Sequence, residues 1–230
     1  MILAINDEDN YLFQGKRKRL VEQLKEKGIV DNNVLGAILK IPRHLFFDSN
    51  TARPALLDHA YSDKALKIGA GQTISHPFTV AFQSEKLNII KGEKVLEIGT
   101  GCGYQTAVLL EMGAKVYSIE RQKELFDKTK LFLPQLGYRS AKLIYGDGYK
   151  GLPQYAPFDK IIVTAAAPYI PDDLLAQLTI GGILVIPLGE GEEQIMNVIV
   201  KKSGTEFEKQ AFGKFKFVPM LQNKNKNQIG

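Results

Sequence analysis

Cysteine and histidine are scarce in this sequence, and long apolar runs are absent from it. The 230 residues include one cysteine, Cys102, so an intrachain disulfide is excluded, as expected for a reducing compartment. The histidines His44, His59 and His76 lack the spacing of metal ligands, and we expect no metal site. No apolar run approaches the ~20 residues that span a bilayer, and the short apolar start turns acidic at Asp7, unlike a secretory signal. We therefore expect a cytoplasmic protein with no membrane partner.

The net charge of +5 is a small excess for a chain with 30 basic and 25 acidic residues. Its only tight basic cluster, residues 16–19, fits the solvent-facing side of a helix better than a site for a polyanion. We therefore expect no nucleic-acid partner, and we expect a monomer. A chain of this length can form one domain with an elaborated end and bury roughly 70% of the surface of the unfolded chain.

The N-terminal third, residues 1–75, is predicted to form a helical and loop-rich layer that packs on the rest of the chain and does not fold independently. Apolar residues recur at helical spacing from residue 20 to 24, and Gly28 can end this helix. Asp31 can cap a second helix. Residues 46–71 have weak periodicity with proline and glycine, so we expect a covering layer of loops there.

Short apolar strands alternate with amphipathic helices in the predicted core, residues 76–222. The predicted strands cover residues 94–98, 115–119, 141–145, 160–164, 183–188, 194–201 and 210–218. The predicted helices cover residues 77–87, 105–112, 122–136 and 171–178, and Gly181-Gly182 ends the last. Alternation of this kind is typical of parallel βαβ units. We expect an α/β, Rossmann-like fold with a mixed, mostly parallel sheet, an N-terminal helical extension and C-terminal antiparallel strands. The polar tail, residues 223–230, is predicted to be disordered.

A glycine-rich turn follows the first predicted core strand and leads into a helix. The sequence Glu97-Ile-Gly-Thr-Gly-Cys-Gly103 lets the backbone turn tightly and approach a ligand closely. Its G-x-G-x-G spacing differs from the G-x-G-x-x-G of dinucleotide sites, which hold a pyrophosphate. It favours S-adenosylmethionine, whose carboxylate can accept hydrogen bonds at the helix start. We expect Gly99, Thr100, Gly101 and Gly103 to contact this cofactor, although a glycine turn taken alone is equally often only a tight turn.

Acidic residues stand at or near the ends of three predicted strands. Glu120 ends the second strand, where its carboxylate can accept both ribose hydroxyls. Asp147 follows the third strand, and we expect it to bind the adenine amino group while Gly146 and Gly148 leave room for the ring. Glu97 is expected to add negative charge near the cationic sulfonium. Ligands of open α/β sheets bind at the carboxyl ends of the strands, so the three loops together indicate one cofactor site.

The stretch Gly71-Gln-Thr-Ile-Ser-His-Pro77 resembles the hallmark of the L-isoaspartyl methyltransferases, in which Thr-Ile-Ser is followed by a variable residue and Pro. Other stretches resemble landmarks of the same family in order: Pro42-Arg43 with Phe46, Tyr61-Ser-Asp63, residues 95–105, Gly146-Asp-Gly148, Phe158-Asp159, Gln177-Leu178 with Gly181-Gly182, and Phe217-Val-Pro-Met220. The resemblance covers residues 12–221. On it the chain is identified as a member of the protein-L-isoaspartate (D-aspartate) O-methyltransferase family. Departures at Cys102, His76 and residues 82–85 bear on fine substrate preference and not on the reaction.

The resemblance implies an S-adenosylmethionine-dependent methyltransferase fold and a substrate class. The substrate would be an isoaspartyl residue in a damaged protein or peptide, with D-aspartyl residues as a second candidate. Its free α-carboxyl group would be methylated, and S-adenosylhomocysteine would be the second product. The ester would then collapse without the enzyme to a succinimide, which reopens partly to normal aspartate.

Ser75 is the candidate catalytic residue. A carboxylate is ionised at neutral pH, because its pKa is ~3.5–4, so no strong base is required. The enzyme must instead desolvate the carboxylate and align it with the methyl group. We expect Ser75 to orient the substrate, with assistance from Thr73 and from the backbone near His76. We also expect Thr73, Ile74 and Ser75 to contact the cofactor. The alternative role of Ser75 is a helix cap, worth ~1 kcal/mol.

Other functions share parts of this pattern. An O-methyltransferase acting on a small-molecule carboxylate would have the same cofactor half. A nucleic-acid methyltransferase is suggested by the basic balance, but the fourth strand leads into Val163-Thr-Ala-Ala-Ala-Pro168, which lacks an aromatic platform for a flipped base. A cofactor-binding protein without catalysis is the third alternative, and the intact Ser75, Gly101, Glu120 and Asp147 argue against it.

Overall fold

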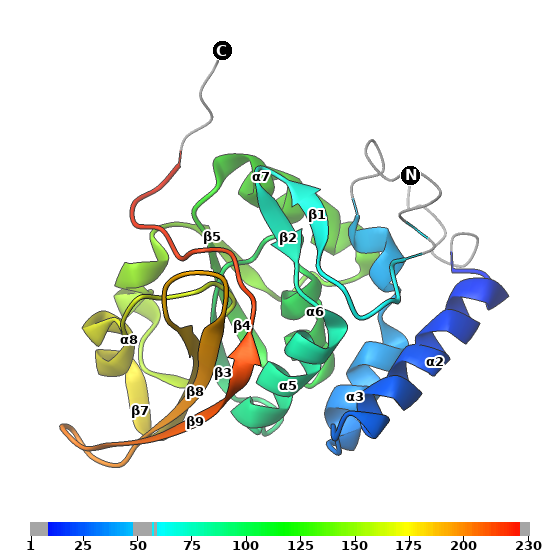
Figure 1. The fold of residues 1–230 in the computed structure, drawn as a ribbon. Helices are drawn as coiled ribbons and strands as arrows, with labels where there is room; N and C mark the ends of the chain where they lie inside the picture. The colour runs from blue at the N-terminus through cyan, green and yellow to red at the C-terminus, as the bar shows by residue number, and fades with distance from the viewer. Residues whose placement is uncertain (1–8, 48–56, 58, 226–230) are drawn as a thin grey trace.

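The computed structural model describes residues 9–47, 57 and 59–225, which fold around a seven-stranded sheet (Figure 1). The strand order is β5-β4-β3-β6-β7-β8-β9. The strands are β3 (Lys94–Ile98), β4 (Lys115–Glu120), β5 (Lys142–Tyr145), β6 (Phe158–Val163), β7 (Leu178–Leu188), β8 (Gln194–Lys201) and β9 (Phe207–Phe215). The five strands from β5 to β7 are parallel, whereas β8 and β9 each pair antiparallel with the preceding strand. The expected mixed sheet with C-terminal antiparallel strands is confirmed.

The N-terminal helices lie outside the helices of the core (Figure 1). The helix α2 (Tyr11–Glu26) packs against α3 (Asn32–Lys40) and α5 (Pro77–Leu87), and α3 also contacts α6 (Tyr104–Glu111). The side chains of Asn10 and Asp31 cap α2 and α3 by accepting hydrogen bonds from backbone N–H groups. The remaining core helices are α7 (Lys123–Phe132) and α8 (Asp172–Ala176). The expected N-terminal helical extension is confirmed, and no helix of the described ranges is long and apolar enough to cross a membrane.

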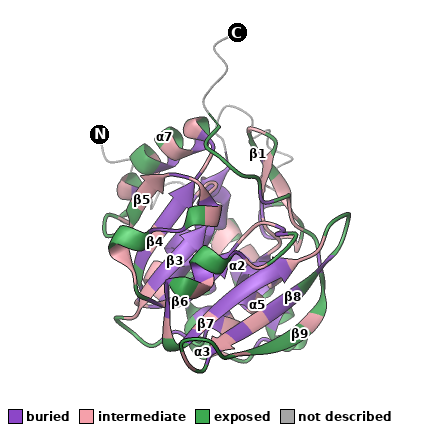
Figure 2. Cartoon of the chain, turned by 90° about the vertical axis from the view of Figure 1, so that its left-hand side faces the viewer, coloured by how far each residue is buried: buried purple, intermediate pink, exposed green. Residues whose placement is uncertain are grey.

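The apolar core divides into two clusters because neighbouring residues of a strand face opposite sides of the sheet. In β3, Val95 belongs to the cluster that includes the N-terminal helices, α5 and α6, whereas Leu96 and Ile98 belong to the cluster with α8 and Met220. Figure 2 shows the central strands in the buried colour, while most of β9 is exposed. The carboxyl ends of β3, β4 and β6 therefore stand on a rigid, buried base.

The strand β7 begins earlier than predicted, and the helix before it ends earlier. The structure ends α8 at Ala176 and starts β7 at Leu178, so Gly181-Gly182 lies within the strand instead of ending a helix. Leu178 pairs with Phe158 and Ile183 pairs with Lys160, so the residues between them bulge out of the ladder. Gly181 has a φ of +80°, a conformation that favours glycine, and this explains why the glycines resemble a helix end in the sequence.

Two further boundaries differ from the prediction. Residues 46–71, predicted to be loops, contain β1 (Leu66–Gly69), which forms an antiparallel hairpin with β2 (Gln72–Ile74). Residues 48–56 and 58 of that stretch lie outside the described residues. The last strand was predicted at 210–218 but runs from Phe207 to Phe215, because it is an exposed edge strand whose polar residues carry little apolar alternation.

The tail prediction does not hold for residues 223–225. The backbone of Asn225 forms hydrogen bonds with Arg121 and Lys123, beside the end of β4. Asn223 donates its N–H to Asp147 at 2.9 Å. Local polarity suggested disorder, but contacts with distant residues order this part of the tail. The remainder, residues 226–230, lies outside the described residues.

Candidate active site

A cavity lies at the carboxyl ends of β3, β4 and β6, where the strand order reverses beside β3 and ligands of such sheets bind. Eight of the residues predicted for the site line it: Thr73, Ile74, Ser75, Gly99, Thr100, Gly101, Glu120 and Gly148. Five others predicted for the site are not among the lining residues: His76, Glu97, Gly103, Gly146 and Asp147. The cavity therefore brings the Thr-Ile-Ser stretch together with the glycine turn and the end of β4.

The glycine turn has a backbone that other residues would adopt only with strain. Gly99, Gly101 and Gly103 all have positive φ angles, of +101°, +54° and +85°. A Cβ atom at Gly99 would lie 2.5 Å from the hydroxyl of Thr164, which itself donates to the backbone oxygen atoms of Ile98 and Gly99. The turn therefore presents bare backbone to the cavity.

Glu120 is fixed by the turn that it faces. Its Oε2 accepts a hydrogen bond from the N–H of Gly101 at 2.9 Å, and its Oε1 accepts one from the N–H of Gln122 at 2.8 Å. Burial raises the pKa of Glu120, although these backbone N–H groups oppose the shift. Each carboxylate oxygen can accept more than one hydrogen bond, so Glu120 can also accept from a hydroxyl pair in the cavity.

Glu97 lies beneath the turn instead of in the cavity wall. Its side chain is completely buried and accepts a hydrogen bond from the hydroxyl of Thr106. Burial raises the pKa of Glu97 to about 8. The negative charge expected from Glu97 near the sulfonium stays a prediction.

Asp147 also has a different environment from the one expected. Its Oδ1 accepts a hydrogen bond from the N–H of Tyr149 at 3.0 Å, and its Oδ2 accepts the one from Asn223. The side chain thus links the loop after β5 to the C-terminal segment, residues 216–225. Gly148 next to it lines the cavity and packs so closely that a Cβ would lie 2.4 Å from Ile98. The adenine contact of Asp147 stays a prediction.

Ser75 lies between the β1–β2 hairpin and the start of α5. Its side of the cavity also includes Thr73, Ile74 and Val80. The carbonyl oxygen of Ser75 accepts a hydrogen bond from Nη2 of Arg43 at 2.7 Å. The backbone of the serine is therefore held from behind by Arg43, and the role of its hydroxyl stays a prediction.

The start of α5 is capped by a residue that the sequence did not reveal. His76 occupies the N-cap position but makes no capping hydrogen bond, and burial lowers its pKa. Oδ1 of Asp63 accepts the N–H of Phe78 at 2.9 Å instead. The N–H of Phe78 is thus already occupied, and the assistance expected from the backbone near His76 stays a prediction.

Several cavity residues were not predicted. They are Gln72, Val80, Ile98, Cys102, Tyr104, Gln105, Ile119, Arg121, Gln122, Thr164, Ala165 and residues 218–221. Gln105 could have been predicted from its position next to the glycine turn, and Arg121 from its position next to Glu120. The segment 218–221 is far from the turn in sequence, and tertiary contacts such as the bridge between Ala166 and Pro219 and the hydrogen bond from Tyr149 to Met220 bring it to the cavity.

Buried polar atoms near the turn provide a test of whether the residues fit S-adenosylmethionine. Oε1 of Gln105 is buried without a hydrogen-bond partner among the described residues, and Gln105 lines the cavity. Unpaired buried acceptors are costly, and an ammonium group supplies the donors that such acceptors lack. The glycine turn, the carboxylate at the end of β4 and the unpaired amide oxygen of Gln105 on α6 fit this cofactor.

Comparison with known proteins assigns the chain to a family. The family model described as "Protein-L-isoaspartate(D-aspartate) O-methyltransferase (PCMT)" matches residues 15–225. A protein-L-isoaspartate O-methyltransferase from Christiangramia forsetii is 62% identical over 218 residues, which is 95% of this chain and all of the relative.

Solved structures agree with the family match. A structure described as a protein-L-isoaspartate O-methyltransferase is 28% identical with a TM-score of 0.80, over 90% of this chain and 66% of that one. A β-aspartate methyltransferase (PCMT) from Plasmodium falciparum in complex with S-adenosyl-L-homocysteine is 28% identical with a TM-score of 0.76, over 90% of this chain and 99% of that one. This chain therefore belongs to the protein-L-isoaspartate (D-aspartate) O-methyltransferase family and has the fold of the S-adenosylmethionine-dependent methyltransferases.

Proposed function

We propose that this protein transfers a methyl group from S-adenosylmethionine to the free α-carboxylate of isoaspartyl residues in proteins and peptides, and that Ser75 orients the acceptor. The observation that carries the proposal is that Ser75, Gly101 and Glu120 line one cavity. A hydroxyl donor for an anion thus lies in the same space as a backbone and a carboxylate suited to a nucleoside. Family membership supports the same reaction.

The cofactor half of the cavity is assigned to the ends of β3 and β4. S-adenosylmethionine, when bound, supplies a methyl group that is already activated by its sulfonium. Glu120 would accept hydrogen bonds from the ribose hydroxyls, because its carboxylate is fixed at the rim by two backbone N–H groups. The glycine turn and Gln105 would hold the methionine part, and the space beside Gly148 would receive the adenine ring.

The acceptor half is assigned to the Thr-Ile-Ser stretch. Ser75 would donate its hydroxyl hydrogen bond to one carboxylate oxygen, and Thr73 would assist from the β1–β2 hairpin. The free carboxylate is ionised at pH 7, so these residues have to position it and exclude water, and they do not have to remove a proton.

A pair of peptides tests the proposal. The protein with methyl-labelled S-adenosylmethionine should label a peptide that contains one isoaspartyl residue and release volatile methanol from the ester, but should not label the normal aspartyl twin. Equal labelling of the twins would contradict the proposal. Labelling of a small carboxylic acid alone, or of RNA alone, would assign the cavity to one of the alternative methyltransferase classes.

A further inference from the structure

Arg43 is a completely buried cation beside the cavity. Its Nε donates to the carbonyl oxygen of Ala60 at 2.9 Å and its Nη2 donates to that of Ser75, whereas its Nη1 has no hydrogen-bond partner among the described residues. The ion pairs within residues 9–47, 57 and 59–225 include none to Arg43. A guanidinium stays protonated in proteins, so the part of the chain that the structure describes supplies no anion for this buried charge.

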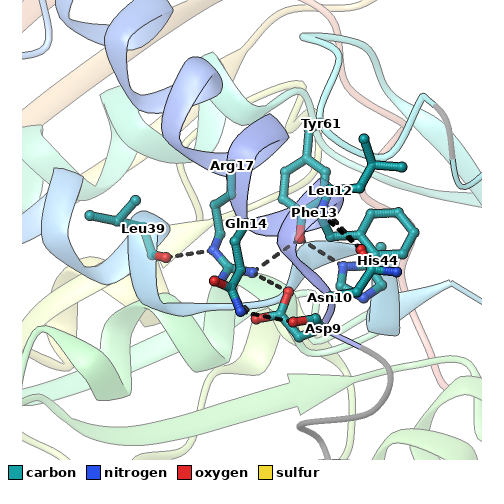
Figure 3. A network of polar contacts seen from close by, with 9 residues as sticks. All are labelled: Asp9, Asn10, Leu12, Phe13, Gln14, Arg17, Leu39, His44 and Tyr61. Carbon is teal, nitrogen blue, oxygen red and sulfur yellow. Dashed lines mark hydrogen bonds and ion pairs between the residues drawn. The ribbon is translucent and has the colours of Figure 1, made fainter.

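A second buried arginine shows how the same fold satisfies such a charge elsewhere. Both terminal nitrogens of Arg17 donate to the carboxylate of Asp9, at 3.0 and 2.8 Å, and its Nε donates to the carbonyl oxygen of Leu39 (Figure 3). Burial lowers the pKa of Arg17, but its contacts with Asp9 and Tyr61 together outweigh burial and raise that pKa overall, whereas burial lowers the pKa of Arg43. Burial of a charge costs free energy unless it is paired, so the missing anion at Arg43 requires an explanation.

The position of Arg43 supplies that explanation. Its Cζ lies 4.7 Å from the ring centroid of Tyr104, which lines the cavity, and its Nη2 holds the backbone of Ser75, which lines it too. The charge therefore stands directly behind the residue to which the proposed function assigns the acceptor carboxylate. A positive charge in a buried environment attracts an anion more strongly than it would in water.

We propose that Arg43 is a positioning residue that fixes Ser75 and makes the acceptor side of the cavity selective for an ionised carboxylate over a neutral group. This inference rests on the proposed function. Methyl transfer forms a bond between a carboxylate oxygen and the methyl carbon and breaks the bond from that carbon to sulfur. The sulfonium takes the electron pair and becomes a neutral thioether, and the carboxylate becomes a neutral ester. The neutral ester no longer balances the positive charge of Arg43, and this favours release of the product.

The test uses binding, with turnover excluded by S-adenosylhomocysteine. Calorimetry would measure the affinity of the loaded protein for an isoaspartyl peptide and for the same peptide with an α-carboxamide in place of the α-carboxylate. The wild type should prefer the acid, and R43Q should lower the ratio of the two affinities about tenfold. R43K, which keeps the charge, should retain most of the ratio. R17Q is the matched control, since it removes a buried arginine away from the cavity, and should leave the ratio unchanged.

Each outcome decides between a charge effect and a general structural effect. An unchanged ratio in R43Q, or an equal fall in R17Q, would overturn the inference. If R43Q does not fold, R43K is the decisive variant. A large fall in its ratio of acid to carboxamide affinity, despite the retained charge, would contradict the proposed selectivity. A wild type that does not methylate the isoaspartyl peptide would instead refute the proposed function, so the two failures are distinguishable.

Discussion

The N–H of Gly101 donates to the carboxylate of Glu120 at 2.9 Å, so the glycine turn and the end of β4 fix each other's position. The turn exposes backbone to the cavity, and the carboxylate faces the same space from the neighbouring strand. A residue that binds ribose must have a defined orientation before the ligand arrives, and this hydrogen bond supplies it. The cofactor half of the site is therefore preorganised by its own two elements.

E120Q tests this relationship. The amide group cannot accept both backbone hydrogen bonds, and it lacks the charge that strengthens the ribose contacts, so we expect the affinity for S-adenosylhomocysteine to fall about tenfold or more. Calorimetry measures it directly. D127N is the control, since Asp127 lies on the exposed side of α7 in an ion pair with Lys123. Wild-type affinity in E120Q would remove Glu120 from the cofactor site.

S75A separates catalysis from helix capping. Without the hydroxyl, the acceptor carboxylate loses a charge-assisted hydrogen bond, so we expect kcat to fall about tenfold or more while cofactor affinity changes little. Steady-state kinetics and calorimetry give the two quantities. S203A is the matched control, because the hydroxyl of Ser203 accepts only backbone hydrogen bonds in the turn between β8 and β9. Unchanged kinetics in S75A would leave the serine a structural role only.

Asp63 rather than His76 is expected to stabilise the start of α5. D63A removes the oxygen that accepts the N–H of Phe78, and the loss of such a cap costs ~1 kcal/mol of the free energy of unfolding. H76A should cost less than ~0.5 kcal/mol, because the histidine makes no capping bond. Urea unfolding of both variants measures the difference. A larger loss in H76A than in D63A would contradict the assignment of the cap.

Arg121 is expected to hold the C-terminal segment over the cavity. It donates to the carbonyl oxygens of Gln222 and Asn223 at 3.3 and 3.0 Å, and residues 218–221 line the cavity. R121A should therefore increase amide exchange in residues 218–225 and speed the dissociation of S-adenosylhomocysteine severalfold. R139A, which changes an exposed arginine away from this segment, is the control. Equal exchange in both variants would show that the segment does not depend on Arg121.

Glu97 gives the stability a defined dependence on pH. Its folded-state pKa of about 8 lies above the ordinary value of 4.5, so the folded protein binds more protons than the unfolded chain between these values. The free energy of unfolding therefore decreases as pH rises from about 4.5 to 8. E97Q should lack this contribution, and urea unfolding at pH 5 and pH 8 should show a smaller decrease than in the wild type. Parallel decreases would contradict the raised pKa.

Local patterns were sufficient for much of this fold and site. The βαβ order, the glycine turn and Glu120 could be predicted because strand ends, turn glycines and neighbouring polar residues lie within short stretches of sequence. Local patterns misled where one signal has two structural meanings. Gly181-Gly182 resembles a helix end, and the structure uses it in a bulge of β7.

Contacts between distant residues could not be predicted from the sequence. Arg43 bonds the carbonyl of a residue 32 positions away, and Asp147 binds the N–H of a residue 76 positions away. The first places a buried charge behind Ser75, and the second orders part of a polar tail. Neither residue has a neighbour in the sequence that indicates its partner, because the topology of the sheet brings the partners together.

The most direct measurement is a crystal structure with S-adenosylhomocysteine and an isoaspartyl peptide bound. We predict that the ribose hydroxyls bind Glu120 and that one α-carboxylate oxygen lies within hydrogen-bond distance of the Ser75 hydroxyl. That carboxylate should lie in line with the sulfur, with space for a methyl carbon ~3–3.5 Å from the reacting oxygen. A peptide carboxylate bound away from Ser75, or a nucleoside bound outside the cavity between Gly101 and Glu120, would contradict it.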